Sequence, residues 1–289
     1  MATMELAVSL VRPASLARIG TTRSARGAYW QALHRDPGLA SWLSDFAPTH
    51  LYLGSEFCEQ LLPSVHTLKA GLCRAQESGL KCVLLTPIAS PQCIRSLADL
   101  LPLLPDGAEI IVNDWGVAYF IREHFPALRA IAGRILCRMI KDPRLRGGDW
   151  APQCGLGVES ARFQALLKRL GFSHVEMDVP IFAESGVFSG LPMRKSVHLP
   201  FSYIAKGRMC RPGSLAAVGP ERFAVGRRCR KECLGLSAKI DRPGIADRLD
   251  SYQVGNTLFA RHSPEMRDVV TCAVDNGHID RLVVPGDAP

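Results

Sequence analysis

Three cysteines in one basic, glycine-containing stretch are the side chains of this sequence best suited to chemistry. Cys229 and Cys233 are four residues apart, so both sulfurs would face the same way on a helical turn. Cys210 supplies a third sulfur from a separate segment. A soft metal centre usually takes four ligands, around either one tetrahedral zinc ion or an iron-sulfur cluster. A fourth ligand must come from elsewhere in the chain, and Cys58 is the candidate.

Basic residues surround these cysteines and account for much of the net charge of +8. Nearby cations would stabilise four thiolates around a cluster, because such a centre carries net negative charge. Two other interpretations stay open, since a charge cluster is often only a solvated surface and a basic protein can bind nucleic acid or anionic lipid. The residues concerned are Lys206, Arg208, Arg211, Arg222, Arg227, Arg228, Arg230 and Lys231.

The length and composition are those of an ordinary globular protein. At 289 residues, 47% hydrophobic and 21% charged, the chain favours one large α/β domain over two small ones. Ten cysteines are too few for a disulfide scaffold of this length, and no secretory leader precedes them, which predicts a cytoplasmic protein. No apolar run approaches the roughly 18 residues of a membrane span. We expect one domain over residues 1–289, in which residues 206–235 form a cysteine-rich, cluster-binding segment.

Apolar runs of strand length alternate with stretches of helical periodicity along most of the chain. This repeated βα order predicts a parallel sheet, and the count favours closure into a (β/α)8 barrel, with a doubly wound open sheet as the alternative. Two weaker strands are expected at 236–240 and 256–261. The main strands are predicted at 4–10, 50–54, 81–86, 108–112, 127–136, 174–179, 197–205 and 280–284, and the helices at 27–46, 61–78, 90–104, 117–124, 160–170 and 264–277.

The carboxyl ends of the strands build the active site of such a barrel. Cys58 follows the second predicted strand, Asp114 the fourth, Arg138 the fifth and Cys210 the seventh. We therefore expect these four residues to meet at one rim of the barrel.

Asp114 and Arg138 are the candidate catalytic residues. Asp114 could accept a proton or position a substrate, although an aspartate after a strand is commonly a turn or helix-capping residue. Arg138, together with Arg134, Lys141 and Arg144, could bind a carboxylate through charge-assisted hydrogen bonds. The alternative is that these cations lie in a surface loop.

Several other residues are interpreted as structural. Cys73, Cys82, Cys93 and Cys272 lie within apolar periodicity and are expected to be small buried hydrophobes. His198 is expected to pack rather than to catalyse. No Ser-His-Asp arrangement or metalloprotease spacing is present, so peptidase activity is not expected.

Five segments of the sequence resemble one known family. The stretches YLGSEFC, IVNDWGV, AGRILCRMIKDPRL and HLPFSYIAKGRMC, followed by CRKEC, are similar to the collagenase-like "peptidase U" family, which despite its name includes iron-sulfur proteins. The similarity extends from residue 51 to 233, with a looser match over 255–268. It implies a barrel-like fold.

The cysteine layout indicates a branch of that family. Longer members carry a cysteine a few residues before the last Gly-Arg-Cys, whereas PFSYIAKGRMC has none before Cys210. In the branch that serves ubiquinone biosynthesis, a cysteine after the second strand replaces it, and Cys58 occupies that place. The resemblance therefore implies a [4Fe-4S] cluster bound by Cys58, Cys210, Cys229 and Cys233.

The resemblance also implies a function. The chain would be a subunit of an oxygen-independent hydroxylation system for ubiquinone biosynthesis, using an organic hydroxyl donor. Its partner would be a UbiU-like iron-sulfur protein in a heterodimer, and its substrate a hydrophobic quinone precursor delivered through a lipid-binding accessory protein. The alternative is a tRNA base hydroxylation protein of the same family, for which the basic excess would suit phosphates. A third hypothesis is a non-catalytic electron-transfer or scaffold partner.

Overall fold

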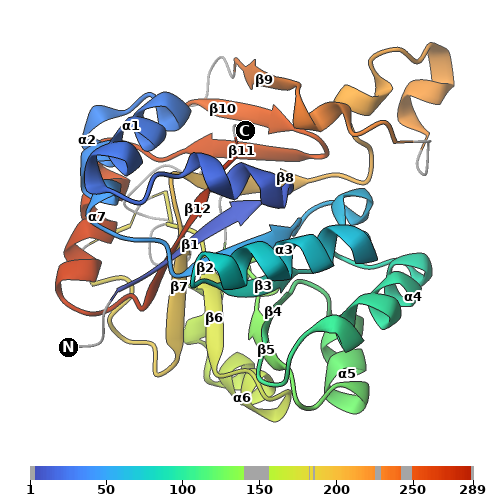
Figure 1. Cartoon of the computed structure of the whole chain (residues 1–289), viewed down its shortest axis with the longest axis horizontal. Coiled ribbons are helices and arrows are strands. Elements are labelled where there is room, and N and C mark those ends of the chain that lie inside the picture. Colours follow the sequence, from blue (N-terminus) through green and yellow to red (C-terminus); the bar gives the residue numbers. More distant parts are fainter. Residues whose placement is uncertain are drawn as a thin grey trace.

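Eight parallel strands close into a barrel in this computed structural model, which describes residues 4–139, 156–181, 183–184, 186–224, 229–241 and 249–287. The strand order around the barrel is β1-β12-β7-β6-β5-β4-β3-β2 (Figure 1). The predicted (β/α)8 barrel is confirmed, and the open sheet is excluded because β1 pairs with both β2 and β12. The strands are β1 (Glu5–Leu10), β2 (His50–Gly54), β3 (Lys81–Leu85), β4 (Glu109–Val112), β5 (Arg129–Ala132), β6 (His174–Met177), β7 (Arg194–His198) and β12 (Arg281–Pro285).

Helices join most of the consecutive strands and cover the outside of the barrel. The described part of the chain between β6 and β7 contains no helix. Several helices begin at a capping side chain, such as Ser90, whose hydroxyl accepts a hydrogen bond from the backbone N–H of Cys93. The helices are α1 (Arg23–His34), α2 (Pro37–Ser44), α3 (Val65–Glu77), α4 (Pro91–Leu100), α5 (Trp115–His124), α6 (Ala161–Arg169) and α7 (Pro264–Asp275).

The single helix predicted over 27–46 is wrong in one respect, because the chain turns in the middle and forms α1 and α2. Arg35 takes a left-handed conformation, with φ of 51°. Asp36 then caps α2 by accepting a hydrogen bond from the N–H of Leu39, and Pro37 occupies the first position of the new helix. An Asp-Pro pair is a strong start signal for a helix, and here it outweighs the continuous apolar periodicity.

The predicted seventh strand, 197–205, is also wrong, because it divides between two sheets. Its first part belongs to β7 of the barrel, and its second part forms β8 (Phe201–Lys206). Pro200 stands between them and lacks the N–H group that a continuous ladder needs. β8 is the first strand of a separate antiparallel sheet of order β8-β11-β10-β9. Its other strands are β9 (Ser237–Ile240), β10 (Ser251–Val254) and β11 (Thr257–Arg261), so the two weaker strands predicted from sequence are confirmed.

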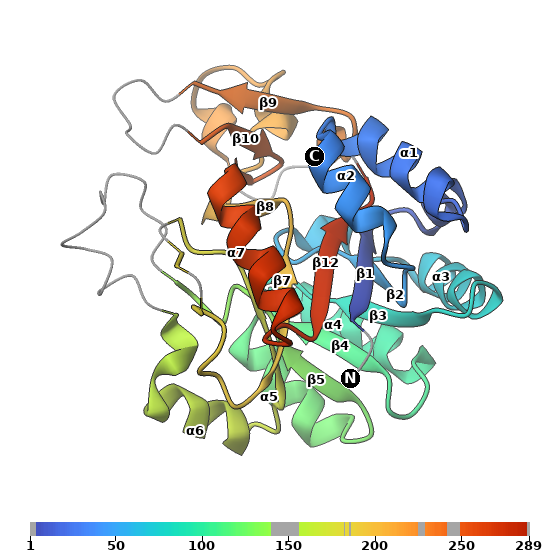
Figure 2. The ribbon, with the colours of Figure 1, turned by 90° about the vertical axis from the view of Figure 1, so that its left-hand side faces the viewer.

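The antiparallel sheet lies beyond the carboxyl ends of the barrel strands (Figures 1 and 2). A compact apolar cluster fills the barrel interior beneath it, and a larger one lies between the strands and the helices. Among the described residues, no helix combines the length and the apolar character needed to cross a membrane. The interior cluster consists of Ala7, Tyr52, Val83, Leu85, Ile111, Ile131 and Val283.

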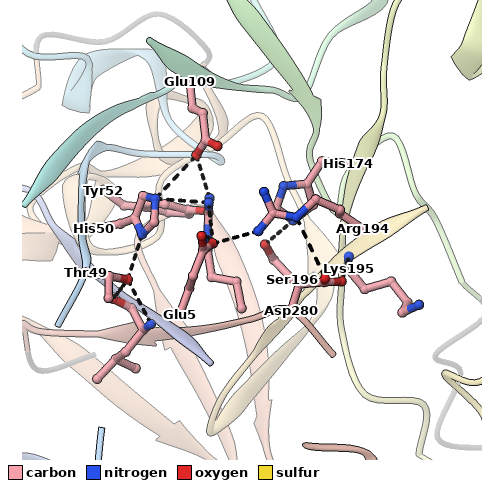
Figure 3. A network of polar contacts seen from close by, with 12 residues as sticks. Glu5, Thr49, His50, Tyr52, Glu109, His174, Arg194, Lys195, Ser196 and Asp280 are labelled. Carbon is pink, nitrogen blue, oxygen red and sulfur yellow. Dashed lines mark hydrogen bonds and ion pairs between the residues drawn. The ribbon is translucent and has the colours of Figure 1, made fainter. Parts of the chain in front are cut away.

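The amino end of the barrel is closed by a polar network around Arg281 (Figure 3). This guanidinium is fully buried and donates hydrogen bonds to Glu5 and Glu109, each at 2.8 Å, and to the Tyr52 hydroxyl at 2.9 Å. Burial by itself would lower the pKa of Arg281, but the neighbouring acidic groups raise it. The network is a structural plug, because the amino face of such a barrel serves stability.

Three buried histidines are held in the neutral form. Burial is the first cause in each case and lowers the pKa of His34 and of His50 to about 4, and that of His174 to about 2. The positive charge of Arg261 adds to the effect at His34, and that of Arg281 at the other two. These side chains bind protons more readily in the unfolded chain, so acid favours unfolding.

We predict that His34→Phe makes the protein less sensitive to acid. Both ring nitrogens of His34 are buried without a hydrogen-bond partner, and the ring stacks on Trp30 at 5.7 Å, so phenylalanine can replace it. Above pH 6.5 His34 is neutral in the folded and the unfolded chain, so it does not change the free energy of unfolding. As the pH falls from 6.5 toward 4, only the unfolded chain takes up the proton, which lowers the free energy of unfolding by about 1.4 kcal/mol per pH unit. Urea unfolding between pH 7 and pH 4 would measure the slope, with the exposed His66→Phe as control. Equal slopes in wild type and His34→Phe would contradict the prediction.

Candidate functional site

A cavity of about 1510 Å³ opens between the barrel and the antiparallel sheet. The loops after β1, β2, β5 and β7 form one wall, and residues of β8 and of the β10–β11 hairpin form the other. All four predicted cysteine ligands line it: Cys58, Cys210, Cys229 and Cys233. The cavity is therefore at the end of the barrel where the sequence predicted a site.

The four cysteines come from three segments that are far apart in the sequence. Cys58 lies between β2 and the short helix η2 (Glu59–Leu61), and Cys210 follows β8. Cys229 and Cys233 come later and flank the start of η8 (Glu232–Leu234). Burial first, and then the charges of the other three thiols, raise the pKa of Cys233 to about 11. The four sulfurs thus lie close enough to share one electrostatic environment.

Backbone N–H groups point at these sulfurs. The N–H of Lys231 donates to Sγ of Cys229 at 3.2 Å, and Lys231 takes a left-handed conformation, with φ of 60°, in that turn. Burial raises the pKa of Cys58 and of Cys210, while backbone N–H groups of Gln60 and Gly213 lower it. Such donors stabilise the thiolate form, which is the form that binds metal.

Asn256 joins the loops that carry the first two cysteines. Its side-chain amide donates to the carbonyl of Phe57 at 2.8 Å and to the carbonyl of Gly207 at 3.0 Å. It lies in a two-residue turn between β10 and β11, where Gly255 has a φ of +58°. Glycine suits the first position of such a turn, and a Cβ there would also lie 3.4 Å from Cβ of Cys233. The hairpin therefore contacts all three cysteine-bearing segments.

A buried ion-pair cluster lies deeper in the same cavity. The Arg134 guanidinium donates to both carboxylate oxygens of Glu56 at 2.8 to 3.1 Å and to Asp178 at 2.7 Å. Its charged group lies over the rings of Phe57 and Tyr203, at 5.1 and 5.8 Å from their centroids. The cluster joins the loops after β2, β5 and β6 to strand β8. Because Glu56 is two residues before Cys58, it also fixes the position of that loop.

Glu176 and His198 extend this cluster into the barrel. Glu176 is fully buried, and its Oε2 lies 3.1 Å from Nε2 of His198. His198 is buried, as predicted, and also lines the cavity. Sequence reasoning missed Glu56, Glu176 and Asp178. The available signal was the presence of carboxylates inside or directly after apolar strands, where an unpaired charge is costly.

The two candidate catalytic residues have different positions. Arg138 is exposed and lines the cavity. Asp114 does not line it but caps α5, accepting hydrogen bonds from the N–H groups of Gly116 at 2.7 Å and Val117 at 3.2 Å. The structure therefore gives Asp114 the capping role that the sequence left open. Asp114 follows β4 at the same rim of the barrel, where its charge raises the pKa of Lys206, but it does not reach the cavity. Lys141 and Arg144 lie outside the described residues.

The remaining cysteines are only partly as expected. Cys93 is buried and Cys82 half-buried, but the interpretation of Cys73 and Cys272 as buried hydrophobes is wrong, since both are exposed. They lie on the outer side of α3 and α7, where the apolar periodicity continues past the buried face. Cys137 is buried, and its thiol donates to the carbonyl of Ala132 at 3.5 Å.

Comparison with known proteins finds only weak structural similarity. No protein-family model matches the chain, and no curated protein matches it. Among solved structures, a group IV chitinase from Ostrinia furnacalis in complex with allosamidin is 12% identical with a TM-score of 0.37, over 98% of this chain and 91% of that chain. A glycoside hydrolase family 18 N-acetylglucosaminidase from Paenibacillus barengoltzii is 10% identical with a TM-score of 0.38, over 98% and 94% of the two chains. These values support no transfer of activity.

We predict that Asn256→Ala loosens the loop of Cys58. The substitution leaves two carbonyls without their donor, which costs about 1 to 3 kcal/mol of stability, and it frees the Cys58 thiol to react faster. The measurement is the alkylation rate of each cysteine by mass spectrometry in metal-free, reduced protein. Asn276→Ala, which removes an exposed amide at the end of α7, is the matched control. An unchanged alkylation rate at Cys58 would show that the hairpin does not hold the loop.

Proposed function

We propose that the chain binds a [4Fe-4S] cluster through Cys58, Cys210, Cys229 and Cys233. The observation that carries the proposal is that these four thiols, from three distant segments, line one cavity together with backbone donors to the sulfurs. Four thiolates are the usual ligand set of such a cluster. When bound, the cluster would supply one-electron chemistry at the mouth of the barrel.

A single zinc ion would need the sulfurs closer together than they lie. Zn–S bonds of about 2.3 Å in a tetrahedron place the sulfurs about 3.8 Å apart, whereas among the described residues no three cysteine sulfurs lie within 4.8 Å of one another. Four thiolates suit either centre, so the metal content distinguishes the two.

Cations at the cavity suit the negative charge of such a centre. Lys206 and Arg208 line the cavity beside Cys58 and Cys210. Burial lowers the pKa of Lys206, whereas the neighbouring Cys58 raises it, so deprotonated thiols would keep this ammonium charged. A positive charge near a cluster stabilises its reduced form and raises its potential.

We predict that anaerobically purified protein contains about four iron and four sulfide per chain. Cys58→Ser and Cys229→Ser should lose most of both, because each removes one of four ligands. Cys73→Ser changes an exposed cysteine on α3 and should retain the cluster, so it is the matched control. Iron and acid-labile sulfide analysis would measure this. One zinc per chain without sulfide would contradict the proposal, and full retention in Cys58→Ser would show that the fourth ligand is another residue.

The wider function proposed is that of a UbiV-like protein of the collagenase-like "peptidase U" family. It would act with a UbiU-like partner in the oxygen-independent hydroxylation of ubiquinone precursors. The support is the cysteine layout together with aromatic side chains on the cavity wall, which suit an aromatic ring: Phe57, Phe201, Tyr203 and Phe259. In this role Arg138, an exposed cation of the cavity, would bind the carboxylate of a donor or substrate.

A second candidate, hydroxylation of tRNA bases, is favoured by a specific observation. Arg138, Lys206 and Arg208 all line the same cavity, so a base could enter while its phosphates contact these cations. The two hypotheses share the cluster and differ in the substrate.

We predict that a strain lacking this protein accumulates unhydroxylated quinone precursors when it grows without oxygen. A plasmid copy of the wild type or of Cys73→Ser should restore the quinone, whereas Cys58→Ser should not, because the reaction depends on the cluster. Quinone intermediates and tRNA nucleosides would be measured in the same cultures by mass spectrometry. A normal quinone profile with loss of a hydroxylated tRNA base would replace the first function by the second.

A further inference from the structure

A second group of ligand atoms, separate from the cysteines, lies where the cavity enters the barrel. One ligand atom each from Glu56, Glu176 and His198 lie within 4.8 Å of one another, and no other trio of His, Cys, Asp or Glu among the described residues does so. Their exposed fractions are 5%, 0% and 5%. A carboxylate pair with an imidazole is an oxygen and nitrogen donor set, which suits divalent first-row metals rather than a sulfur-bound cluster.

The carboxylate of Glu176 is only partly satisfied. Its Oε2 contacts His198, but its Oε1 is buried without a hydrogen-bond partner. The Tyr52 hydroxyl accepts a hydrogen bond from Arg281 at 2.9 Å and keeps its own proton, which it can donate to the Glu176 carboxylate beside it; Oε1 itself has no donor at hydrogen-bond geometry. A buried carboxylate oxygen without a donor is costly. A cation bound at this point would remove that cost.

The buried charged side chains at the mouth of the barrel do not balance one another. Glu56, Glu176 and Asp178 bring three negative charges, and Arg134 brings one positive charge, all with at most 6% exposure. The formal sum of these four charges is −2, which one divalent ion would balance.

The distance between His198 and Glu176 fits octahedral coordination. Ligand bonds of about 2.1 Å place neighbouring ligand atoms about 3.0 Å apart, and Nε2 of His198 lies 3.1 Å from Oε2 of Glu176. Glu56 can bind a metal while it pairs with Arg134, because a carboxylate has about four lone-pair positions. Arg134 would then orient this ligand, as hydrogen-bonded partners of metal ligands commonly do.

From these observations we infer that Glu56, Glu176 and His198 bind one divalent first-row metal ion at the mouth of the barrel. Glu56 and His198 also line the cavity, so the open coordination positions of the ion face the space where a substrate would lie. The ion could hold a substrate hydroxyl or carboxylate in reach of the cysteine centre. The inference is independent of the cluster, because it uses none of the cysteines.

In the test, the protein is titrated with Mn²⁺ alone. Binding is measured as the loss of the electron paramagnetic resonance signal of free Mn²⁺. We expect one site per chain in the wild type and in Cys229→Ala/Cys233→Ala, which lacks two of the four proposed thiol ligands. Glu176→Gln and His198→Gln should bind Mn²⁺ at least tenfold more weakly. Glu123→Gln removes the same charge from an exposed position on α5 and should bind as the wild type does.

Thermal unfolding with and without Mn²⁺ gives an independent measurement on the same variants. A ligand that binds only the folded state raises Tm, so Mn²⁺ should raise Tm of the wild type and of Glu123→Gln but not of Glu176→Gln. The unfolding transition of each variant also shows whether that variant is folded. The inference is overturned if the wild type shows no saturable Mn²⁺ binding, or if Glu176→Gln binds Mn²⁺ as tightly as the wild type. Either result leaves the iron and sulfide content, and hence the proposed cluster, unaffected.

Discussion

The buried guanidinium of Arg134 is the interaction on which the arrangement of the site depends. It binds Glu56 and Asp178 and also donates to the carbonyl of Phe201 at 3.3 Å, so that one side chain connects three barrel loops with the first strand of the antiparallel sheet. Burial alone would lower the pKa of Arg134, but the two carboxylates raise it. The charge is therefore maintained inside the protein. Removal of one member would leave buried charges unpaired, at a cost of about 3 to 5 kcal/mol.

This constraint places two chemically different sets of donors in one cavity. The cysteine sulfurs lie toward the antiparallel sheet, and the carboxylates and imidazole lie toward the barrel interior. Soft and hard ligands select different metals, so the two sets need not compete. Glu56 and Cys58 are only two residues apart, and the loop after β2 therefore contributes to both.

The elements of the barrel were largely predictable because each strand is a short apolar run that ends at a turn or capping residue. The errors occurred where a local signal opposed the periodicity. The Asp36-Pro37 pair ended one helix and began another, and Pro200 separated two strands that the apolar pattern joins. Cys73 and Cys272 share the periodicity of their helices but lie on the exposed side, because a pattern of 3.6 residues does not specify how wide the buried face is.

The sequence by itself determined the order of strands and helices and the barrel class, since these follow from local periodicity, and the chemistry of the side chains singled out the four cysteines that line the cavity. It could not determine that Glu56 and Asp178 pair with Arg134, that Glu176 contacts His198, nor that Asp114 would be used as a helix cap. Those contacts join residues that are 22 to 78 positions apart. Only closure of the barrel decides which strand ends face one another, because contacts between distant segments depend on strand order and register rather than on the neighbouring sequence.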